Sequence, residues 1–176
     1  AFDKLINERR VRPTALEPPS GPEASWAVPF FVPGVGAQGR IYVFYGYNTD
    51  NVREAPCFEG VTWRVDTLGQ YVFRYSDDLG QSWAPQRFEV PVREFAVDRQ
   101  NASGGRLRYF WSVFKPIISQ GKVYLAVHKV GDFGEGFMRY TEGCLVVSDN
   151  MLTQSDVTQL HFETLQIGRA SCRERV

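Results

Sequence analysis

Three residues in the second half of the chain have side chains suited to proton transfer. The imidazole of His128 titrates near neutrality, so it could act as an acid or a base; the alternative is a hydrogen-bonded structural histidine. Asp132 and Glu135 stand beside glycines and could act as acids, the alternative being a solvated loop. We take His128 and Asp132 as candidate catalytic residues and Glu135 as a candidate substrate-binding residue.

Two segments, 46–54 and 128–140, mix polar and aromatic side chains. The mixture is typical of sugar sites, because rings stack on the pyranose face while amide, carboxylate and guanidinium groups bond its hydroxyls. Arg53 and Arg139 could hold a ligand carboxylate in bidentate fashion, or be ordinary surface arginines. The other substrate-binding candidates in these segments are Tyr47, Asn48 and Asp50.

Lys115 interrupts an apolar stretch, residues 110–118, that is typical of a strand. A lysine there either extends its ammonium out to solvent or points it at a ligand. We include Lys115 among the candidate substrate-binding residues.

The cysteines and histidines are too scattered to predict a metal site. Cys57, Cys144 and Cys172 form no CxxC pair, and His128 and His161 stand apart. Cys57 and Cys144 could form one disulfide or none. We predict no metal and no cofactor.

The composition excludes several classes of protein. The chain has 176 residues with 20 basic and 20 acidic side chains, so it lacks the excess of positive charge that binds nucleic acid. It has no apolar run of about 18 residues, so no membrane span is expected. An aromatic content of 14% with 16 glycines and 10 prolines favours short strands joined by turns. We predict an all-β fold.

The strand pattern occurs twice along the chain. In the first unit, short β-branched or aromatic runs predict strands over 26–32, 40–45, 70–75 and 87–90. The segment beginning Gly39-Arg40-Ile41-Tyr42-Val43 then returns as Gly121-Lys122-Val123-Tyr124-Leu125, 82 residues later, and the Trp26 segment returns at Trp111. Two antiparallel four-strand units are typical of propeller blades, of which a closed propeller needs about four to eight.

One motif, Ser76-Asp77-Asp78-Leu79-Gly80-Gln81-Ser82-Trp83, lies between the third and fourth predicted strands. It fits the pattern S-x-D-x-G-x-[ST]-W, known as the Asp box. Ser76 and Asp78 can bond the backbone amides of the turn, Gly80 allows a backbone angle that a side chain would forbid, and Trp83 can cover the hairpin. We therefore predict structural roles for Ser76, Asp78, Gly80 and Trp83.

With these strands, the repeat and the Asp box, residues 26–165 resemble the sialidase superfamily of BNR-repeat β-propellers. The resemblance implies a partial six-bladed β-propeller of about two four-stranded antiparallel blades, from a retaining exo-glycosidase that acts on terminal sialic acid of a glycan. Such enzymes use three arginines, a Tyr nucleophile paired with a Glu, and an Asp acid/base. Propeller geometry would gather segments 46–54 and 128–140 where the innermost strands begin, and would place Lys115 beside the central channel.

The sequence departs from the family pattern at the catalytic set. The Arg-Ile-Pro motif is absent, Val11-Arg12-Pro13 being the nearest text, and the remaining catalytic residues normally lie in later blades. Two alternatives to a sialidase-like glycoside hydrolase stay open. One is a non-catalytic BNR-repeat propeller that binds glycans or proteins, and the other is a propeller-fold polysaccharide lyase with His128 at the channel.

We expect residues 1–25 to be an irregular connecting segment, 26–95 a blade with its Asp box, and 107–166 a second, truncated blade. Residues 167–176 read like the in-frame translation of a common sequencing adapter, so we expect this tail to be non-native; the alternative is a natural Arg-rich C-terminal tail. A glycan substrate implies a secreted or periplasmic protein. Asn101-Ala102-Ser103 fits a glycosylation sequon, which matters only in a glycosylating host.

Overall fold

The structure is a computed structural model that describes residues 21–62, 65–134 and 137–169. It is built mostly of antiparallel strands, which confirms the all-β prediction. The strands are β1 (Ala24–Val32), β2 (Arg40–Tyr47), β3 (Ala55–Cys57), β4 (Gly60–Thr62), β5 (Gln70–Ser76), β6 (Phe88–Glu89), β7 (Phe110–Trp111), β8 (Ile117–Ser119), β9 (Lys122–Val130), β10 (Thr141–Ser148) and β11 (Glu163–Arg169). The helical segments are short: α2 (Ala96–Arg99), η2 (Phe137–Tyr140) and η3 (Val157–Gln159).

The first sheet is a meander with strand order β1-β2-β5-β6. Phe44 lies opposite Phe73, which lies opposite Phe88, so these rings share one face of the sheet. Val43 and Tyr45, which flank Phe44 along β2, point to the other face of the sheet. The small β3–β4 hairpin is inserted between β2 and β5.

The second sheet has the order β11-β10-β9-β7, and β8 also pairs with β9. The prediction of one continuous strand over 110–118 is wrong. The chain instead forms two short strands, β7 and β8, with residues 112–116 between them. Pro116 has no N–H to donate to a ladder. Lys115 therefore lies in this break and is exposed.

The predicted sequence repeat corresponds to equivalent positions in the two sheets. Gly39 precedes β2 with a φ of 86°, and Gly121 precedes β9 with a φ of 74°. In both units a glycine in the left-handed region ends the connection into the second strand. This connection covers residues 33–39 in the first unit and residues 120–121 in the second. The chain thus builds the same antiparallel unit twice.

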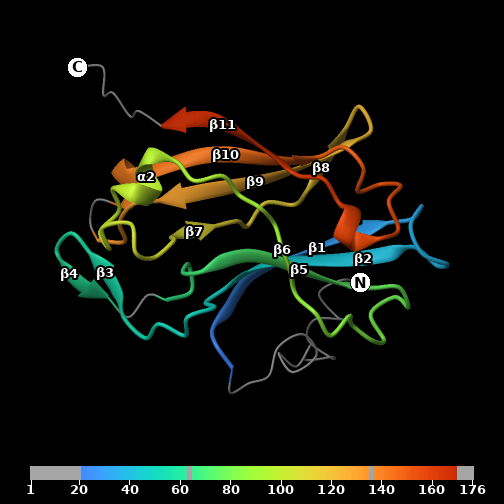
Figure 1. Cartoon of the computed structure of the whole chain (residues 1–176), viewed down its shortest axis with the longest axis horizontal. Coiled ribbons are helices and arrows are strands. Elements are labelled where there is room, and N and C mark those ends of the chain that lie inside the picture. The colour runs from blue at the N-terminus through green and yellow to red at the C-terminus, as the bar shows by residue number, and fades with distance from the viewer. Residues whose placement is uncertain (1–20, 63–64, 135–136, 170–176) are drawn as a thin grey trace, which may run out of the picture.

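The two sheets pack face to face, as the layers in Figure 1 show. The rings of Tyr71 and Phe110 meet across the layers with centroids 5.6 Å apart. Burying each large apolar side chain contributes roughly 1.5–3 kcal/mol. We call this layer the inter-sheet core, and its members include Phe30, Tyr42, Phe44, Tyr71 and Phe73 from the first sheet and Phe110, Val123, Leu125, Val127, Cys144 and Val146 from the second.

The Asp-box turn is held by short polar bonds to its own backbone. Ser76 Oγ accepts hydrogen bonds from the amides of Asp78 (3.3 Å) and Gly80 (2.8 Å) and donates to Asp78 Oδ1 (2.6 Å). The Ser82 amide and hydroxyl donate to the Asp78 carboxylate at 2.8 and 2.6 Å. Gly80 has a φ of 88°, and Trp83 packs on an apolar cluster of the first sheet. The motif fixes a turn and leaves no group of Asp78 for catalysis.

Arg40 joins the Asp-box turn to the second sheet. Its Nε and Nη2 donate to the two carboxylate oxygens of Asp77 at 2.7 and 2.9 Å, and Nη1 donates to the Ser155 carbonyl at 2.7 Å. Its guanidinium carbon lies 4.3 Å from the Tyr75 ring centroid. The side chain is only 5% exposed. Arg40 is therefore an inter-sheet tie as well as the first residue of β2.

The expected connecting segment and tail lie mostly outside the described residues. Residues 1–20 and 170–176 are not among them, whereas β1 already begins at Ala24 and β11 runs through residues 167–169. No helix in the described ranges has the length and apolarity that crossing a bilayer requires.

Candidate functional site

The β3–β4 hairpin and the segment that follows β9 come together at one end of the two sheets. The Phe58 amide donates to Asp132 Oδ1 at 2.9 Å, and the rings of Phe58 and Tyr140 have centroids 5.0 Å apart. Tyr109 Oη also donates to the Pro56 carbonyl at 3.1 Å. The connections that follow the second strands of the two units are thus in contact.

Asp132 braces this contact. Its residue is 1% exposed, and its carboxylate accepts the Phe58 amide from the other connection. A catalytic acid needs to reach the proton that it transfers, and this buried position offers little access to a ligand. The geometry favours a structural role for Asp132 over the predicted catalytic one.

His128 is held by Trp111, its direct partner in the β7–β9 register. Trp111 Nε1 lies 2.5 Å from His128 Nδ1. Because an indole nitrogen only donates, Nδ1 must accept, and the neutral ring must carry its proton on Nε2. Burial lowers the pKa of His128. His128 is therefore suited to donating a hydrogen bond from Nε2 rather than to accepting a proton at Nδ1.

Trp26 completes an aromatic group that was not among the predicted site residues. Its ring meets that of Trp111 edge to face, with centroids 5.7 Å apart, and the Phe114 ring meets His128 at 5.4 Å. Trp26 sits at a bulge in β1 with a φ of 61°. The sequence did hold a signal, because Trp26 and Trp111 occupy matching places in the repeat. We call Trp26, Trp111, Phe114 and His128 the aromatic platform.

A polar pocket of about 230 Å³ opens beside the first of the two predicted segments. Thr49 Oγ1 donates to Gln70 Oε1 at 3.2 Å, and Gln70 Nε2 donates to Glu89 Oε2 at 2.9 Å. Arg108 Nη1 lies 3.7 Å from Glu89 Oε1. The pocket is lined by Asn48, Thr49, Asp50, Val52, Leu68, Gly69, Gln70, Arg106, Leu107 and Arg108.

Asn48 shapes the wall of this pocket. It is 2% exposed, its Nδ2 donates to the Val52 carbonyl at 2.8 Å, and its Oδ1 accepts the Val52 amide at 3.1 Å. Both polar atoms are thus used inside the loop. Asn48 thereby positions Thr49 and Asp50, which are exposed, and its predicted role in binding a ligand stays a prediction.

Arg106 and Arg108 were not predicted as site residues and are presented by a tightly bonded loop. Asn101 Oδ1 accepts from the Ser103 amide and hydroxyl and from the Gly105 amide, while its Nδ2 donates to the Leu107 carbonyl at 2.7 Å. Arg106 Nε donates to the Ser103 carbonyl at 2.9 Å. Because Asn101 is 3% exposed and both ends of its amide are hydrogen-bonded, the sequon noted in the sequence is inaccessible in the folded chain.

Three further predicted binding residues, Arg53, Arg139 and Tyr47, are not among the residues that line the polar pocket. Arg53 and Arg139 are exposed and do not line it. Tyr47 is buried, and the Arg87 guanidinium lies 4.0 Å from its ring centroid. Glu135 lies outside the described residues.

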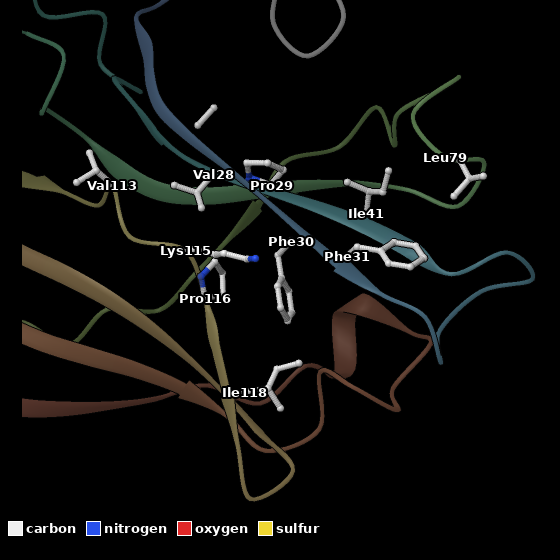
Figure 2. A pocket seen from close by; sticks show the side chains of 11 residues that line it. Val28, Pro29, Phe30, Phe31, Ile41, Leu79, Val113, Lys115, Pro116 and Ile118 are labelled. Atoms are coloured by element: carbon white, nitrogen blue, oxygen red, sulfur yellow. The ribbon is translucent and has the colours of Figure 1, made fainter. Parts of the chain in front are cut away.

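Lys115 lines a separate apolar groove between β1 and the break in the second sheet. The groove has a volume of about 1110 Å³. Lys115 reaches across it toward Phe30 (Figure 2). Among the described residues that line the groove, Lys115 is the only charged one. The others are Ala27, Val28, Pro29, Phe30, Phe31, Ile41, Leu79, Val113, Pro116 and Ile118.

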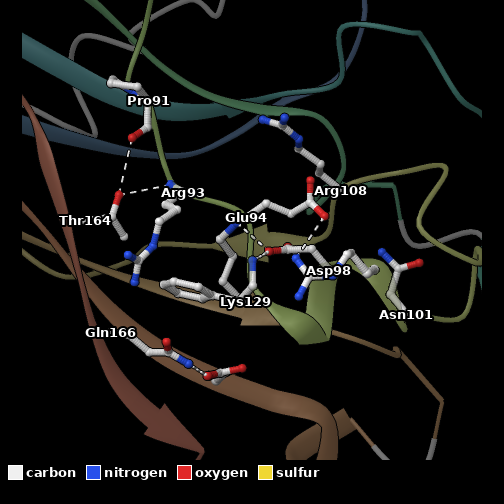
Figure 3. A network of polar contacts seen from close by, with 12 residues as sticks. Pro91, Arg93, Glu94, Asp98, Asn101, Arg108, Lys129, Thr164 and Gln166 are labelled. Atoms are coloured by element: carbon white, nitrogen blue, oxygen red, sulfur yellow. Dashed lines mark hydrogen bonds and ion pairs between the residues drawn. The ribbon is translucent and has the colours of Figure 1, made fainter.

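A buried ion pair supports the connection between the two sheets (Figure 3). Lys129 Nζ lies 2.9 Å from Asp98 Oδ2, and each side chain is 4% exposed. Asp98 Oδ2 also accepts the Phe95 amide at 2.7 Å. The pair fixes α2 against β9 and is remote from solvent, so it has a structural role.

Among the described residues, no three His, Cys, Asp or Glu side chains gather as metal ligands would. The site offered by the fold thus consists of the polar pocket and the aromatic platform. Comparison of the chain with protein-family models, curated proteins and solved structures gives no match.

Proposed function

We propose that this chain is part of a six-bladed β-propeller of sialidase type and that the protein is an exo-glycosidase acting on terminal sugars of glycans. The observation that carries the proposal is the Asp-box turn joining the third and fourth strands of a four-stranded meander that the chain builds twice. A secreted or periplasmic location would give such a protein access to glycans.

The polar pocket is the proposed site for the terminal sugar. Its volume of about 230 Å³ suits one small ring rather than a longer ligand. Arg106 and Arg108 provide guanidinium groups that can hold a sugar carboxylate in bidentate fashion. Thr49, Asp50 and Gln70 offer hydroxyl, carboxylate and amide groups for the sugar hydroxyls.

A second candidate function is glycan binding without hydrolysis. It is favoured by the state of the two predicted catalytic groups, since Asp132 is buried on the Phe58 amide and His128 Nδ1 is occupied by Trp111.

Two measurements on the full-length protein that contains this chain separate these functions. The first is release of 4-methylumbelliferone from its sialoside, and the second is calorimetric binding of sialyllactose. Turnover supports the exo-glycosidase, whereas saturable binding without turnover supports the binding protein. Absence of both overturns the proposal.

The Arg108→Lys variant tests the assigned pocket. A lysine keeps the charge but loses the bidentate fork, so we expect sialyllactose affinity to fall about tenfold or more. Arg99→Lys, an exposed arginine paired with Glu94 at 3.4 Å, is the matched control. Equal affinity of the two variants would show that the pocket is wrongly assigned.

A further inference from the structure

We propose that the aromatic platform of Trp26, Trp111, Phe114 and His128 is a stacking subsite for a neutral pyranose ring, with His128 Nε2–H donating to a hydroxyl of that sugar. The inference rests on the proposed glycan ligand and adds a sugar unit whose chemistry differs from that of the arginine-lined pocket. It assigns recognition roles to two tryptophans and gives His128 a binding role in place of a catalytic one.

The placement of the rings supports a shared surface. Trp26 comes from β1 and Trp111 from β7, yet their rings meet at an interplanar angle of 73°. The Phe114 ring is set at 82° to His128. Phe114 is 45% exposed, and Trp26, Trp111 and His128 are partly exposed. Rings held against one another with part of their surface in water can stack on the C–H face of a sugar at little entropic cost.

The backbone conformation of Trp26 also supports a binding role for this residue. A bulky residue at a φ of 61° is a true backbone outlier and is strained. The indole Nε1 of Trp26 is also buried without a hydrogen-bond partner, which destabilises the folded state further. The bulge in β1 that produces this conformation turns the ring toward Trp111. Costs concentrated on one residue, in support of one ring contact, indicate a position kept for binding.

The hydrogen bond from Trp111 fixes the chemistry of His128. Since Nδ1 accepts the indole N–H at 2.5 Å, the neutral ring presents Nε2–H as a donor. Protonation would place a second donor on Nδ1, facing the indole N–H, so the contact opposes the imidazolium. A neutral donor beside stacked rings matches a sugar hydroxyl.

The same features disfavour a cationic ligand. The Nε2–H group of His128 would direct a positive hydrogen toward a cation. A neutral pyranose, with one C–H face and hydroxyls at its rim, satisfies both contacts.

The test is a titration of the full chain with methyl β-galactopyranoside and methyl β-glucopyranoside, followed by saturation-transfer NMR. We expect saturable binding of at least one glycoside and a loss of tenfold or more in Trp111→Ala. His128→Gln, which can place an amide donor near the Nε2 position, should bind more tightly than His128→Leu. Trp83→Phe, at the Asp-box turn, is the matched control and should bind as the wild type does.

A second readout separates binding from a merely structural effect. Trp111→Phe keeps a ring but removes the donor to Nδ1, so the pKa of His128 should rise and the Nε2–H tautomer should become less dominant in its ¹⁵N spectrum. Thermal unfolding of each variant identifies any that fails to fold. Wild-type binding that neither Trp111→Ala nor His128→Leu weakens would overturn the subsite, as would absence of binding to both glycosides.

Failure of the stacking subsite can be distinguished from failure of the proposed function. Sialyllactose binding that depends on Arg108, with no binding of either neutral glycoside, removes the subsite and leaves the function standing. Glycoside binding that depends on Trp111, with no sialoside binding or turnover, supports the subsite and removes the anionic-sugar assignment.

Discussion

At the scale of single residues, the carboxylate of Asp78 stabilises the Asp-box turn by accepting hydrogen bonds within it. Hydrogen bonds from Ser76 and then Ser82 lower the pKa of Asp78 from 3.8 to about 2. Because the folded pKa lies below the unfolded one, the ionised carboxylate stabilises the fold. This contribution is complete above about pH 4 and is lost as the pH falls toward about 2.

Asp78→Asn should therefore lower the unfolding midpoint more at about pH 5 than at about pH 2. Urea unfolding of the wild type and the variant across this range measures the difference. Leu79→Ala changes an exposed side chain of the same turn and should give a difference that does not vary with pH. A gap between Asp78→Asn and wild type that stays constant down to about pH 2 would contradict the assignment.

The hydrogen bonds of a polar side chain to its own loop could be predicted only for the Asp-box residues, because that motif is complete in the sequence. The spacing of Ser76, Asp78 and Gly80 specifies their bonds, since all partners lie within a few residues. Asp132 accepts the amide of Phe58, 74 residues away in the chain. Asn48 bonds within its own loop, but a lone Asn carries no signal that separates this role from ligand binding.

At the scale of elements, Gly69 connects the polar pocket to β5. Its φ is 99°, and its amide donates to the Arg108 carbonyl at 3.1 Å. A Cβ at this position would overlap the backbone carbonyl of Tyr47. The close approach of these segments lets Gln70 and Arg108 line one pocket.

Gly69→Ala should cost more than about 3 kcal/mol, because backbone strain and a backbone clash add. Gly104→Ala is the matched control, since Gly104 also has a positive φ, of 65°, but has open space around its Cβ position. It should cost only about 1–2 kcal/mol. Chemical unfolding measures both losses, and equal losses would show that no clash exists at Gly69.

Most strands can be predicted from the alternation of large apolar residues in the sequence. Two irregularities, a break within 110–118 and a bulge at Trp26, cannot. Residues 110–118 have the composition of one strand, yet the chain leaves the ladder after Trp111 and returns at Ile117. The bulge at Trp26 likewise interrupts a run of apolar residues. At 112–116 the missing N–H of Pro116 interrupts the ladder, and at Trp26 the bulge accompanies the ring contact with Trp111.

At the scale of the whole molecule, the inter-sheet core and the Arg40 tie hold the two sheets as one unit. The core brings side chains from both sheets together, including Cys144 at 1% exposure. Arg40 adds polar bonds from the first sheet to Ser155, which lies in the connection between β10 and β11. Separation of the sheets would break both sets of contacts together.

The thiol of Cys144 offers a direct measure of that separation. Burial raises its pKa to about 11, so the folded chain should react very slowly with iodoacetamide. In a Cys57→Ser, Cys172→Ser background, labelling should then report opening of the inter-sheet core. Arg40→Ala should cost about 2 kcal/mol and speed labelling roughly thirtyfold, because Asp77 and the Ser155 carbonyl lose a nearly buried partner. Arg99→Ala should change the rate less than about threefold, and equal rates for the two variants would mean that Arg40 does not hold the sheets together.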